Sequence, residues 1–195
     1  MSRTALETRI TNETKVEISL DLDGAGEASI STGVGFFDHL LASLAHHGLF
    51  DLTAATVGDL HIDDHHTVED TALVLGTAFA TALGDRSGLH RFGEATVPMD
   101  EAWAQAIVDC GGRPYTVVEL EFGTERIGQL STQNIGHAVE ALSRTAGFTI
   151  HLRGQGTNDH HLAEAAFKTL GRALRRAVEV DTRRPGIAST KGALS

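Results

Sequence analysis

Residues 63–83, DDHHTVEDTALVLGTAFATAL, have a counterpart 95 positions later in residues 158–178, NDHHLAEAAFKTLGRALRRAV. Each stretch carries His-His-x-x-Glu, followed by apolar residues at intervals of three and four, the period of one helix face. These apolar positions are Val68, Ala72, Leu75, Phe79 and Leu83 in the first copy and Ala163, Phe167, Leu170, Leu174 and Val178 in the second. Gly76 also matches Gly171. A repeat offset by about half the chain predicts a duplicated fold.

The segments upstream of these two helices also correspond. Residues 36–48, FFDHLLASLAHHG, and residues 134–147, NIGHAVEALSRTAG, each predict a helix with one histidine near its start. Gly48 and Gly147 are suited to the C-terminal caps of these helices. For the His-His-x-x-Glu helices, Asp63 or Asp64 and Asn158 or Asp159 are suited to the N-terminal caps.

The remaining regular segments predict strands. Residues 15–22, KVEISLDL, and 27–31, EASIS, flank a turn at Asp23-Gly24 and predict a hairpin. Residues 94–100, 104–110 and 115–122 play the same part in the second half. We therefore expect an internally duplicated α+β protein, each half a mostly antiparallel sheet with helices on one face. The expected halves are residues 1–90 and 91–180, followed by a C-terminal tail, 181–195.

Composition excludes several classes of function. Among 195 residues, 26 are acidic and 16 are Lys or Arg, a formal net charge of -10, which disfavours nucleic-acid binding. The single cysteine, Cys110, rules out an internal disulfide and favours a reducing compartment. No stretch approaches the length of a membrane span, and the first residues lack the apolar core of a signal peptide. We expect a soluble, cytoplasmic protein without membrane or nucleic-acid partners.

The histidines predict a two-metal site. Each half supplies one upstream histidine and one His-His-x-x-Glu: His39, His65, His66 and Glu69, then His137, His160, His161 and Glu164. Residues four apart share a helix face, so each glutamate pairs with the first histidine of its motif. Adjacent helical residues point about 100° apart, so the second histidine serves the other metal. Imidazole and carboxylate ligands without thiolate suit Mn²⁺, Fe²⁺, Co²⁺ or Zn²⁺ and exclude a cysteine-type zinc site.

Six segments closely resemble the imidazoleglycerol-phosphate dehydratase family of histidine biosynthesis. They are FFDHLLASLAHHGLFDL (36–52), HIDDHHTVEDTALVLGTA (61–78), RFGEATVPMDEA (91–102), GGRPY (111–115), GTNDHHLAEAAFKTLGRALRRA (156–177) and STKG (189–192). The resemblance covers almost the whole chain, in order. It implies halves of the ribosomal-protein-S5 domain 2-like type and two Mn²⁺ per active site. It also implies a 24-subunit homo-oligomer with active sites at subunit interfaces.

The same resemblance assigns residue roles. One metal is bound by His39, His66, His160 and Glu164, and the other by His65, Glu69, His137 and His161. Contacts with a phosphorylated imidazole substrate fall to Glu13, His47, Arg91, Arg113, Lys168, Ser189, Thr190 and Lys191, together with the metal ligands His39, His65, Glu69 and His160. Glu13 is the expected acid/base residue, and the tail 181–195 contacts substrate. Three places depart from the family pattern: Ala188, Thr190 and Cys110-Gly111. None of them is a metal ligand, so the departures bear only on the details of loops.

The implied reaction removes water from imidazole glycerol phosphate to give imidazole acetol phosphate. Its difficulty is the removal of a proton from a carbon without an adjacent carbonyl. Metals on the two ring nitrogens favour an imidazolate, which accepts the electrons. Arginine and lysine are expected to hold the phosphate. Two alternatives remain open: a dinuclear metallohydrolase acting on a small phosphorylated substrate, and a non-enzymatic metal-binding assembly.

Overall fold

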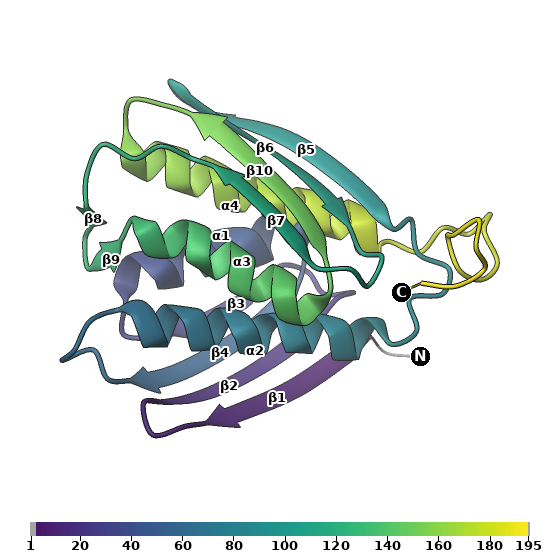
Figure 1. The fold of residues 1–195 in the computed structure, drawn as a ribbon, viewed down its shortest axis with the longest axis horizontal. Coiled ribbons are helices and arrows are strands. Elements are labelled where there is room, and N and C mark those ends of the chain that lie inside the picture. The colour runs from purple at the N-terminus through teal and green to yellow at the C-terminus, as the bar shows by residue number, and fades with distance from the viewer. Residues whose placement is uncertain (1–2, 195) are drawn as a thin grey trace.

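The computed structural model describes residues 3–194, in which four helices lie between two four-stranded sheets (Figure 1). The first unit comprises β1 (Thr4–Ile10), β2 (Thr14–Asp21), β3 (Ala28–Ser31), α1 (Gly35–Gly48), β4 (Asp51–Gly58) and α2 (His65–Leu83). The second comprises β5 (Phe92–Met99), β6 (Ala102–Asp109), β7 (Tyr115–Glu119), a short hairpin of β8 (Arg126–Ile127) and β9 (Leu130–Ser131), α3 (Gln133–Ala146), β10 (Thr149–Gln155) and α4 (Asp159–Val178).

The two sheets have the same topology. Their strand orders are β1-β2-β4-β3 and β5-β6-β10-β7. In each sheet the first two pairings are antiparallel and the last, β3 with β4 or β7 with β10, is parallel. The predicted duplicated α+β fold with mostly antiparallel sheets is therefore confirmed.

The predicted hairpin between residues 15–22 and 27–31 is wrong, because β4 lies between β2 and β3. Thr53 on β4 is paired with Ser19 on one side and Ser29 on the other. The carboxylate of Asp51 accepts hydrogen bonds from the backbone N–H groups of residues 25, 26 and 27. These hydrogen bonds hold the connection between β2 and β3 against the start of β4, so the connection does not form a tight turn. Strand β1 was not predicted, since only Ala5 of its seven residues is buried.

Helices pack across the two halves. Helix α2 lies against α3, and α4 lies against α1. The repeated glycines allow this close approach, since a Cβ at Gly76 would collide with the carbonyl oxygen of Leu142 and one at Gly171 would collide with that of Leu44. Each His-His-x-x-Glu helix thus meets the helix that carries the upstream histidine, His39 or His137, of the other half.

The helix ends confirm some predicted caps and correct another. The Asn158 side chain accepts hydrogen bonds from the backbone N–H groups of His160 and His161 in the first turn of α4, and Gly147 ends α3 in the left-handed conformation. Gly48, however, is the last helical residue of α1, and Leu49 takes the left-handed conformation with φ 54°. Gly48 is needed for a different reason: a Cβ there would lie 2.5 Å from the Phe50 ring.

Both halves contribute to one hydrophobic core. All ten apolar positions of the two predicted helical stripes are buried, as expected. Phe79 packs edge-on against Phe50 of its own half and against Phe148 of the other half, with ring centroids 5.3 and 5.9 Å apart. Within residues 3–194 no helix is long and apolar enough to cross a membrane. The shared core fixes the helix pairs that carry the histidines.

Candidate metal centre

Two groups of potential metal ligands form where helices of different halves meet. The α1–α4 group consists of His39, His160 and Glu164, and the α2–α3 group consists of His65, Glu69 and His137. Within each group the donor atoms lie within 4.8 Å of one another. His39 and His137 each occupy the fifth position of their helix, so the two groups are equivalent in the duplicated fold.

In the α1–α4 group, two imidazoles face one carboxylate oxygen. The Nε2 atoms of His39 and His160 each lie 3.1 Å from Oε2 of Glu164. The other oxygen of Glu164 lies 2.7 Å from Nζ of Lys168. Burial raises the pKa of Glu164, but the hydrogen bonds and charges of Lys168 and His39 outweigh it and hold the pKa at about 2. The group therefore presents an ionised carboxylate with two imidazole nitrogens.

In the α2–α3 group, the ring of His65 stacks on that of His137 with centroids 4.8 Å apart. Nε2 of His65 lies 3.7 Å from one oxygen of Glu69, and Nε2 of His137 lies 3.4 Å from the other. Arg144 donates a hydrogen bond to Glu69 at 3.1 Å. Nε2 of His137 is buried and has no hydrogen-bond partner among the described residues. Such an orphaned acceptor, aimed at a carboxylate and a second imidazole, fits a metal ion.

The second histidine of each motif lies outside these groups. Nδ1 of His66 donates to Oδ2 of Asp59 at 3.0 Å, and Nδ1 of His161 donates to Oε2 of Glu101 at 2.8 Å. These hydrogen bonds raise the pKa of each histidine, and the His161 bond lowers the pKa of Glu101 to about 2. Each expected four-ligand set is thus represented by three residues in one chain, with His66 and His161 facing elsewhere.

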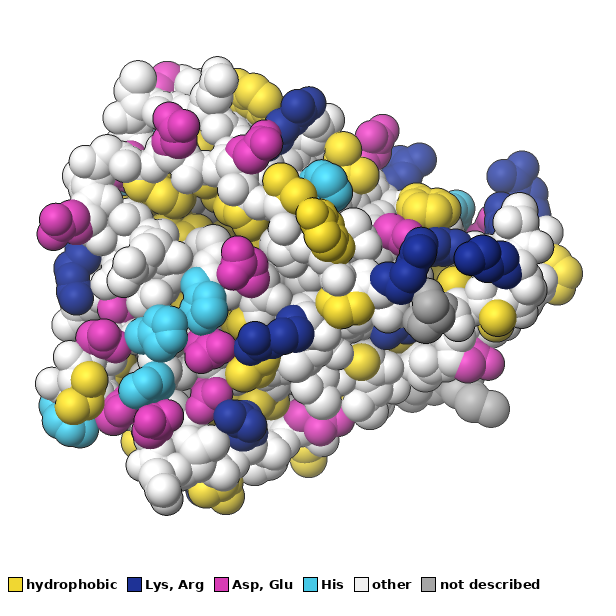
Figure 2. Space-filling view, in the orientation of Figure 1, with side chains coloured by type: hydrophobic (Ala, Val, Ile, Leu, Met, Phe, Trp, Pro, Cys, Tyr) yellow, Lys and Arg dark blue, Asp and Glu magenta, His cyan; other side chains and the backbone are white. Residues whose placement is uncertain are grey.

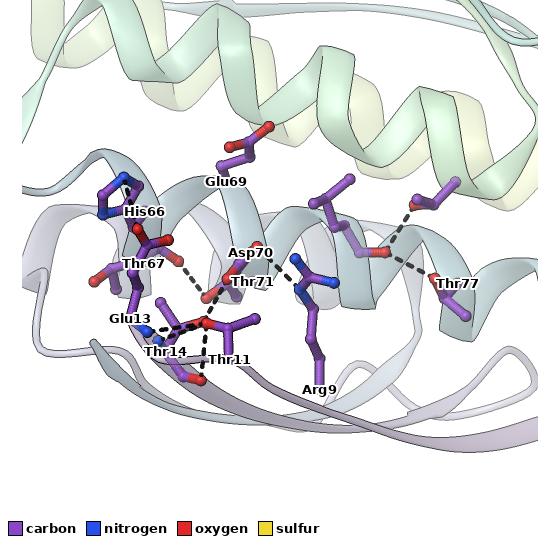
Figure 3. A network of polar contacts seen from close by, with 12 residues as sticks. Arg9, Thr11, Glu13, Thr14, His66, Thr67, Glu69, Asp70, Thr71 and Thr77 are labelled. Atoms are coloured by element: carbon purple, nitrogen blue, oxygen red, sulfur yellow. Dashed lines mark hydrogen bonds and ion pairs between the residues drawn. The ribbon is translucent and has the colours of Figure 1, made fainter. Parts of the chain in front are cut away.

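Glu13 lies at the tip of the β1–β2 hairpin, beside His66 (Figure 3). Its Oε1 is 3.9 Å from Nε2 of His66. Asp70 on α2 anchors the base of this tip by accepting hydrogen bonds from Thr14 and from Arg9. Figure 3 also shows Glu69 projecting from α2 toward the opposite side, where α3 lies. Glu13 therefore belongs with His66 and not with the α2–α3 group.

The residues expected to hold phosphate line one cavity of about 560 Å³. Arg91, Arg113, Ser189, Thr190 and Lys191 all border it, together with Arg184, which sequence reasoning missed. The guanidinium of Arg91 donates two hydrogen bonds to Asp109, at 2.7 and 2.9 Å, and one to the carbonyl of Ala188 at 2.8 Å. The tail is thereby held against the second sheet.

His47 and Lys168 lie near the α1–α4 group instead of this cavity. Lys168 contacts Glu164, as described above. Burial lowers the pKa of His47, and the nearby positive charges of His46, Lys168 and Arg172 lower it further. His47 is therefore held largely neutral and can accept or donate a hydrogen bond beside the group.

The cavity and the metal-ligand groups occupy opposite ends of the molecule. Arg91 donates its backbone N–H to the carbonyl of Ala177, at the C-terminal end of α4, whereas His160 begins that helix. At about 1.5 Å per residue, His160 and Ala177 are about 25 Å apart. Figure 2 shows most histidines of this face gathered among acidic side chains at one end, and a group of Lys and Arg side chains at the other end.

A model of the family described as imidazoleglycerol-phosphate dehydratase matches residues 32–174. The chain is also 53% identical over 192 residues to the imidazoleglycerol-phosphate dehydratase of Methanothermobacter thermautotrophicus, a match that covers 98% of each chain. The chain belongs to the imidazoleglycerol-phosphate dehydratase family. The imidazoleglycerol-phosphate dehydratase of Acidiphilium cryptum is 52% identical over 196 residues, with full coverage of both chains.

Solved structures of imidazoleglycerol-phosphate dehydratases have the same fold. The Staphylococcus aureus enzyme superposes with a TM-score of 0.82 at 31% identity, covering 91% of this chain and 99% of its own. The Pyrococcus furiosus enzyme, solved in complex with (S)-C348, gives 0.82 at 32% identity, covering 96% and 100%. As a member of this family the chain is a hydro-lyase of histidine biosynthesis.

Sequence reasoning missed several residues that contact predicted metal ligands, among them Asp59, Glu101, Asn134 and Arg144. Nδ1 of His65 lies 3.3 Å from Oδ1 of Asn134, which is at the start of α3. The one available signal was position, since Glu101 sits on the β5–β6 hairpin as Glu13 sits on the equivalent β1–β2 hairpin. Asp59, just after β4, gave no such signal.

Proposed function

We propose that this dehydratase converts imidazole glycerol phosphate to imidazole acetol phosphate and water with two Mn²⁺ ions per active site. The observation that carries the proposal is the pair of equivalent three-donor groups in a member of the dehydratase family. Their all-imidazole-and-carboxylate composition suits Mn²⁺ and other divalent transition metals. The single buried cysteine, Cys110, agrees with a reducing compartment such as the cytoplasm.

In this proposal His39, His160 and Glu164 hold one metal, and His65, Glu69 and His137 hold the other. Metal ions held there would supply Lewis acidity to the substrate's imidazole ring and would stabilise negative charge on it. Lys168 keeps Glu164 ionised and orients it through their contact at 2.7 Å, and Arg144 orients Glu69 through a contact at 3.1 Å.

The fourth ligands, His66 and His161, come in this proposal from neighbouring copies of the chain. Neither histidine belongs to a metal-ligand group of its own chain, which supports this arrangement. We assign the phosphate cavity to another copy as well, because about 25 Å along α4 separates it from His160. A three-carbon glycerol phosphate chain is far too short to join the two ends of one molecule. A homo-oligomer, a 24-mer by family resemblance, would place the Arg91 cavity of one copy against the metal-ligand groups of another.

Glu13 is the proposed acid/base residue. Its carboxylate is exposed at a hairpin tip, next to a histidine that this proposal assigns to a metal. A group in that position can take the proton from the substrate carbon and later return it to the leaving hydroxyl. The anchoring of the hairpin by Asp70 limits the movement of Glu13 relative to α2.

Arg113, Ser189, Thr190 and Lys191 complete the proposed phosphate site with Arg91. Four cationic side chains, including Arg184, face this cavity in an otherwise acidic protein. Arg91 offers its charge but has two donors committed to Asp109, so its main part is to fix the tail that carries Ser189 and Lys191.

The deciding experiment incubates the Mn²⁺-loaded protein with imidazole glycerol phosphate and follows the keto product. We expect turnover in the wild type and none in Glu13→Gln, which should keep two Mn²⁺ per chain. Glu17→Gln, an exposed carboxylate further along β2, is the matched control and should retain turnover. If the wild type binds two metals but hydrolyses phosphate esters instead, the metallohydrolase alternative replaces the proposal. If it binds metal without any turnover, the alternative of a non-enzymatic metal-binding assembly replaces the proposal.

A further inference from the structure

The two histidines outside the metal-ligand groups, His66 and His161, share a feature. Each has Nδ1 hydrogen-bonded to a carboxylate, Asp59 at 3.0 Å and Glu101 at 2.8 Å. An ionised carboxylate can only accept hydrogen bonds, so in each of these contacts the hydrogen lies on the ring nitrogen. Nδ1 must therefore carry the hydrogen in the neutral ring, which leaves the Nε2 lone pair free.

We propose that Asp59 and Glu101 are positioning residues that hold His66 and His161 with Nε2 as the metal-binding atom. This inference rests on the proposed two-metal function. In metal sites a carboxylate on the far nitrogen fixes the tautomer and the ring orientation and increases the basicity of the ligand. The need is clear for His66, because the carboxylate beside its Nε2, that of Glu13, lies 3.9 Å away and does not fix the ring by a hydrogen bond.

Other contacts and burial hold the two carboxylates in place. Glu101 also accepts a hydrogen bond at 2.8 Å from the backbone N–H of Asn158, the cap of α4, so it bridges the cap and His161. Asp59 directly follows β4 and is only 16% exposed, and its second oxygen is buried with no partner in the part of the chain that the structure describes. Asp59 is thus held in place by burial, whereas Glu101, 36% exposed, is held by its two hydrogen bonds.

The same contacts account for an asymmetry between the halves. Glu13 and Glu101 lie on equivalent hairpins, but only Glu101 bonds to Nδ1 of the neighbouring histidine. In the first half Asp59 fills that role for His66, which leaves Glu13 without a hydrogen bond to the ring and 3.9 Å from Nε2. Asp59 thereby keeps one hairpin carboxylate available for the substrate.

The test measures Mn²⁺ binding by electron paramagnetic resonance of the free ion, with assembly size and thermal midpoint recorded in parallel. Asp59→Ala and Glu101→Ala should each weaken one of the two Mn²⁺ ions by about 10–100-fold and leave the other tight. The double variant should weaken both. Asp59→Asn keeps an oxygen that can accept from Nδ1 but no charge, so its loss should be smaller than that of the alanine variant.

Asp100→Asn is the matched control. Asp100 lies on the same hairpin, 3.9 Å from Nδ1 of His161, but is 79% exposed and makes no hydrogen bond to it. Wild-type affinity in Asp59→Asn, Asp59→Ala and Glu101→Ala would overturn the inference, as would an equal loss in Asp100→Asn. If the alanine variants do not fold, Asp59→Asn decides alone. Failure of the wild type to bind two ions would instead refute the proposed function.

Discussion

The ring of His65 lies nearly parallel to that of His137, at an interplanar angle of 17°, although the two residues come from different halves of the duplicated chain. The two rings belong to helices α2 and α3, which also pack closely further along, where Gly76 lies against the backbone of Leu142. His66, the next residue along α2, points instead to Asp59 and Glu13. One helical turn thus offers two imidazoles to two different surroundings.

The first prediction concerns these adjacent histidines. His65→Ala and His66→Ala should each leave one Mn²⁺ per chain, and the double variant should leave none, because the two rings serve different metals. Total metal after gel filtration measures this directly. His151→Ala, an exposed position on β10, is the control and should retain two ions. One ion remaining in the double variant would mean that both rings serve the same metal.

The second prediction tests the helix contact at Gly171. A Cβ there would collide with the carbonyl oxygen of Leu44 and lie 3.1 Å from the backbone nitrogen of Gly48, so Gly171→Ala must separate α4 from α1. We expect a loss of about 1–3 kcal/mol in the free energy of unfolding. Movement of His39 away from Glu164 should also weaken the metal of the α1–α4 group. Urea unfolding of the metal-free protein and metal titration measure the two effects.

Gly35→Ala is the control for this substitution. Gly35 begins α1, and a Cβ added there would meet no atom within 4 Å beyond its own helix and chain neighbours. Its stability and metal binding should stay close to those of the wild type. Equal behaviour of the two variants would show that the contact at Gly171 has no special part in the site.

The repeat of His-His-x-x-Glu allowed the fold to be predicted because helical periodicity is local. Val68 and Ala163 begin matched stripes, and the period alone shows which side of each helix is buried. Strand order is not local in this sense. The pairing of β4 between β2 and β3 depends on Asp51, whose carboxylate reaches back to residues 25–27, and no short-range pattern reveals that contact.

The site, like the fold, was predictable from the sequence only where the pattern is local. The spacing of four placed His65 with Glu69 and His160 with Glu164, and the structure has both pairs. The partners Asp59 and Glu101 were not predictable, since a carboxylate at a strand end resembles any solvated charge in sequence. Their role depends on the direction of one ring nitrogen, which only the three-dimensional structure provides.

The third prediction is a dependence of stability on pH through Asp51. Hydrogen bonds from the N–H groups of residues 27, 25 and 26 lower its pKa from the ordinary value of 3.8. A lowered folded-state pKa means that the stabilisation is fully present above pH 3.8 and is lost as the pH falls below it through the folded-state value. Asp51→Asn should therefore be less stable than the wild type at neutral pH, by a margin that shrinks below pH 3.8.

Urea unfolding at a series of pH values measures that margin. Glu27→Gln removes an exposed carboxylate from the same connection and is the control, for which we expect no comparable margin at neutral pH. A difference between Asp51→Asn and the wild type that stays constant below pH 3.8 would contradict the assignment.

The last prediction concerns Arg91, which adopts a left-handed backbone conformation with φ 71° between the phosphate cavity and the tail. Nε and Nη2 of its guanidinium donate hydrogen bonds to Asp109, and Nη1 donates one to the carbonyl of Ala188. Lysine keeps the charge but lacks the planar fork, so Arg91→Lys cannot make all three bonds. The tail that carries Ser189 and Lys191 should then loosen.

We expect faster proteolysis within residues 181–194 of Arg91→Lys. We also expect a KM for imidazole glycerol phosphate raised by about 10-fold, the equivalent of one lost charged hydrogen bond. Two Mn²⁺ should remain bound, because the groups that Arg91 bonds, Asp109 and the carbonyl of Ala188, are not proposed metal ligands. Arg153→Lys, whose guanidinium binds Gln105 on the exposed face of the second sheet, is the control. A raised KM with an unchanged rate of tail cleavage would mean that Arg91 acts on the phosphate directly, without ordering the tail.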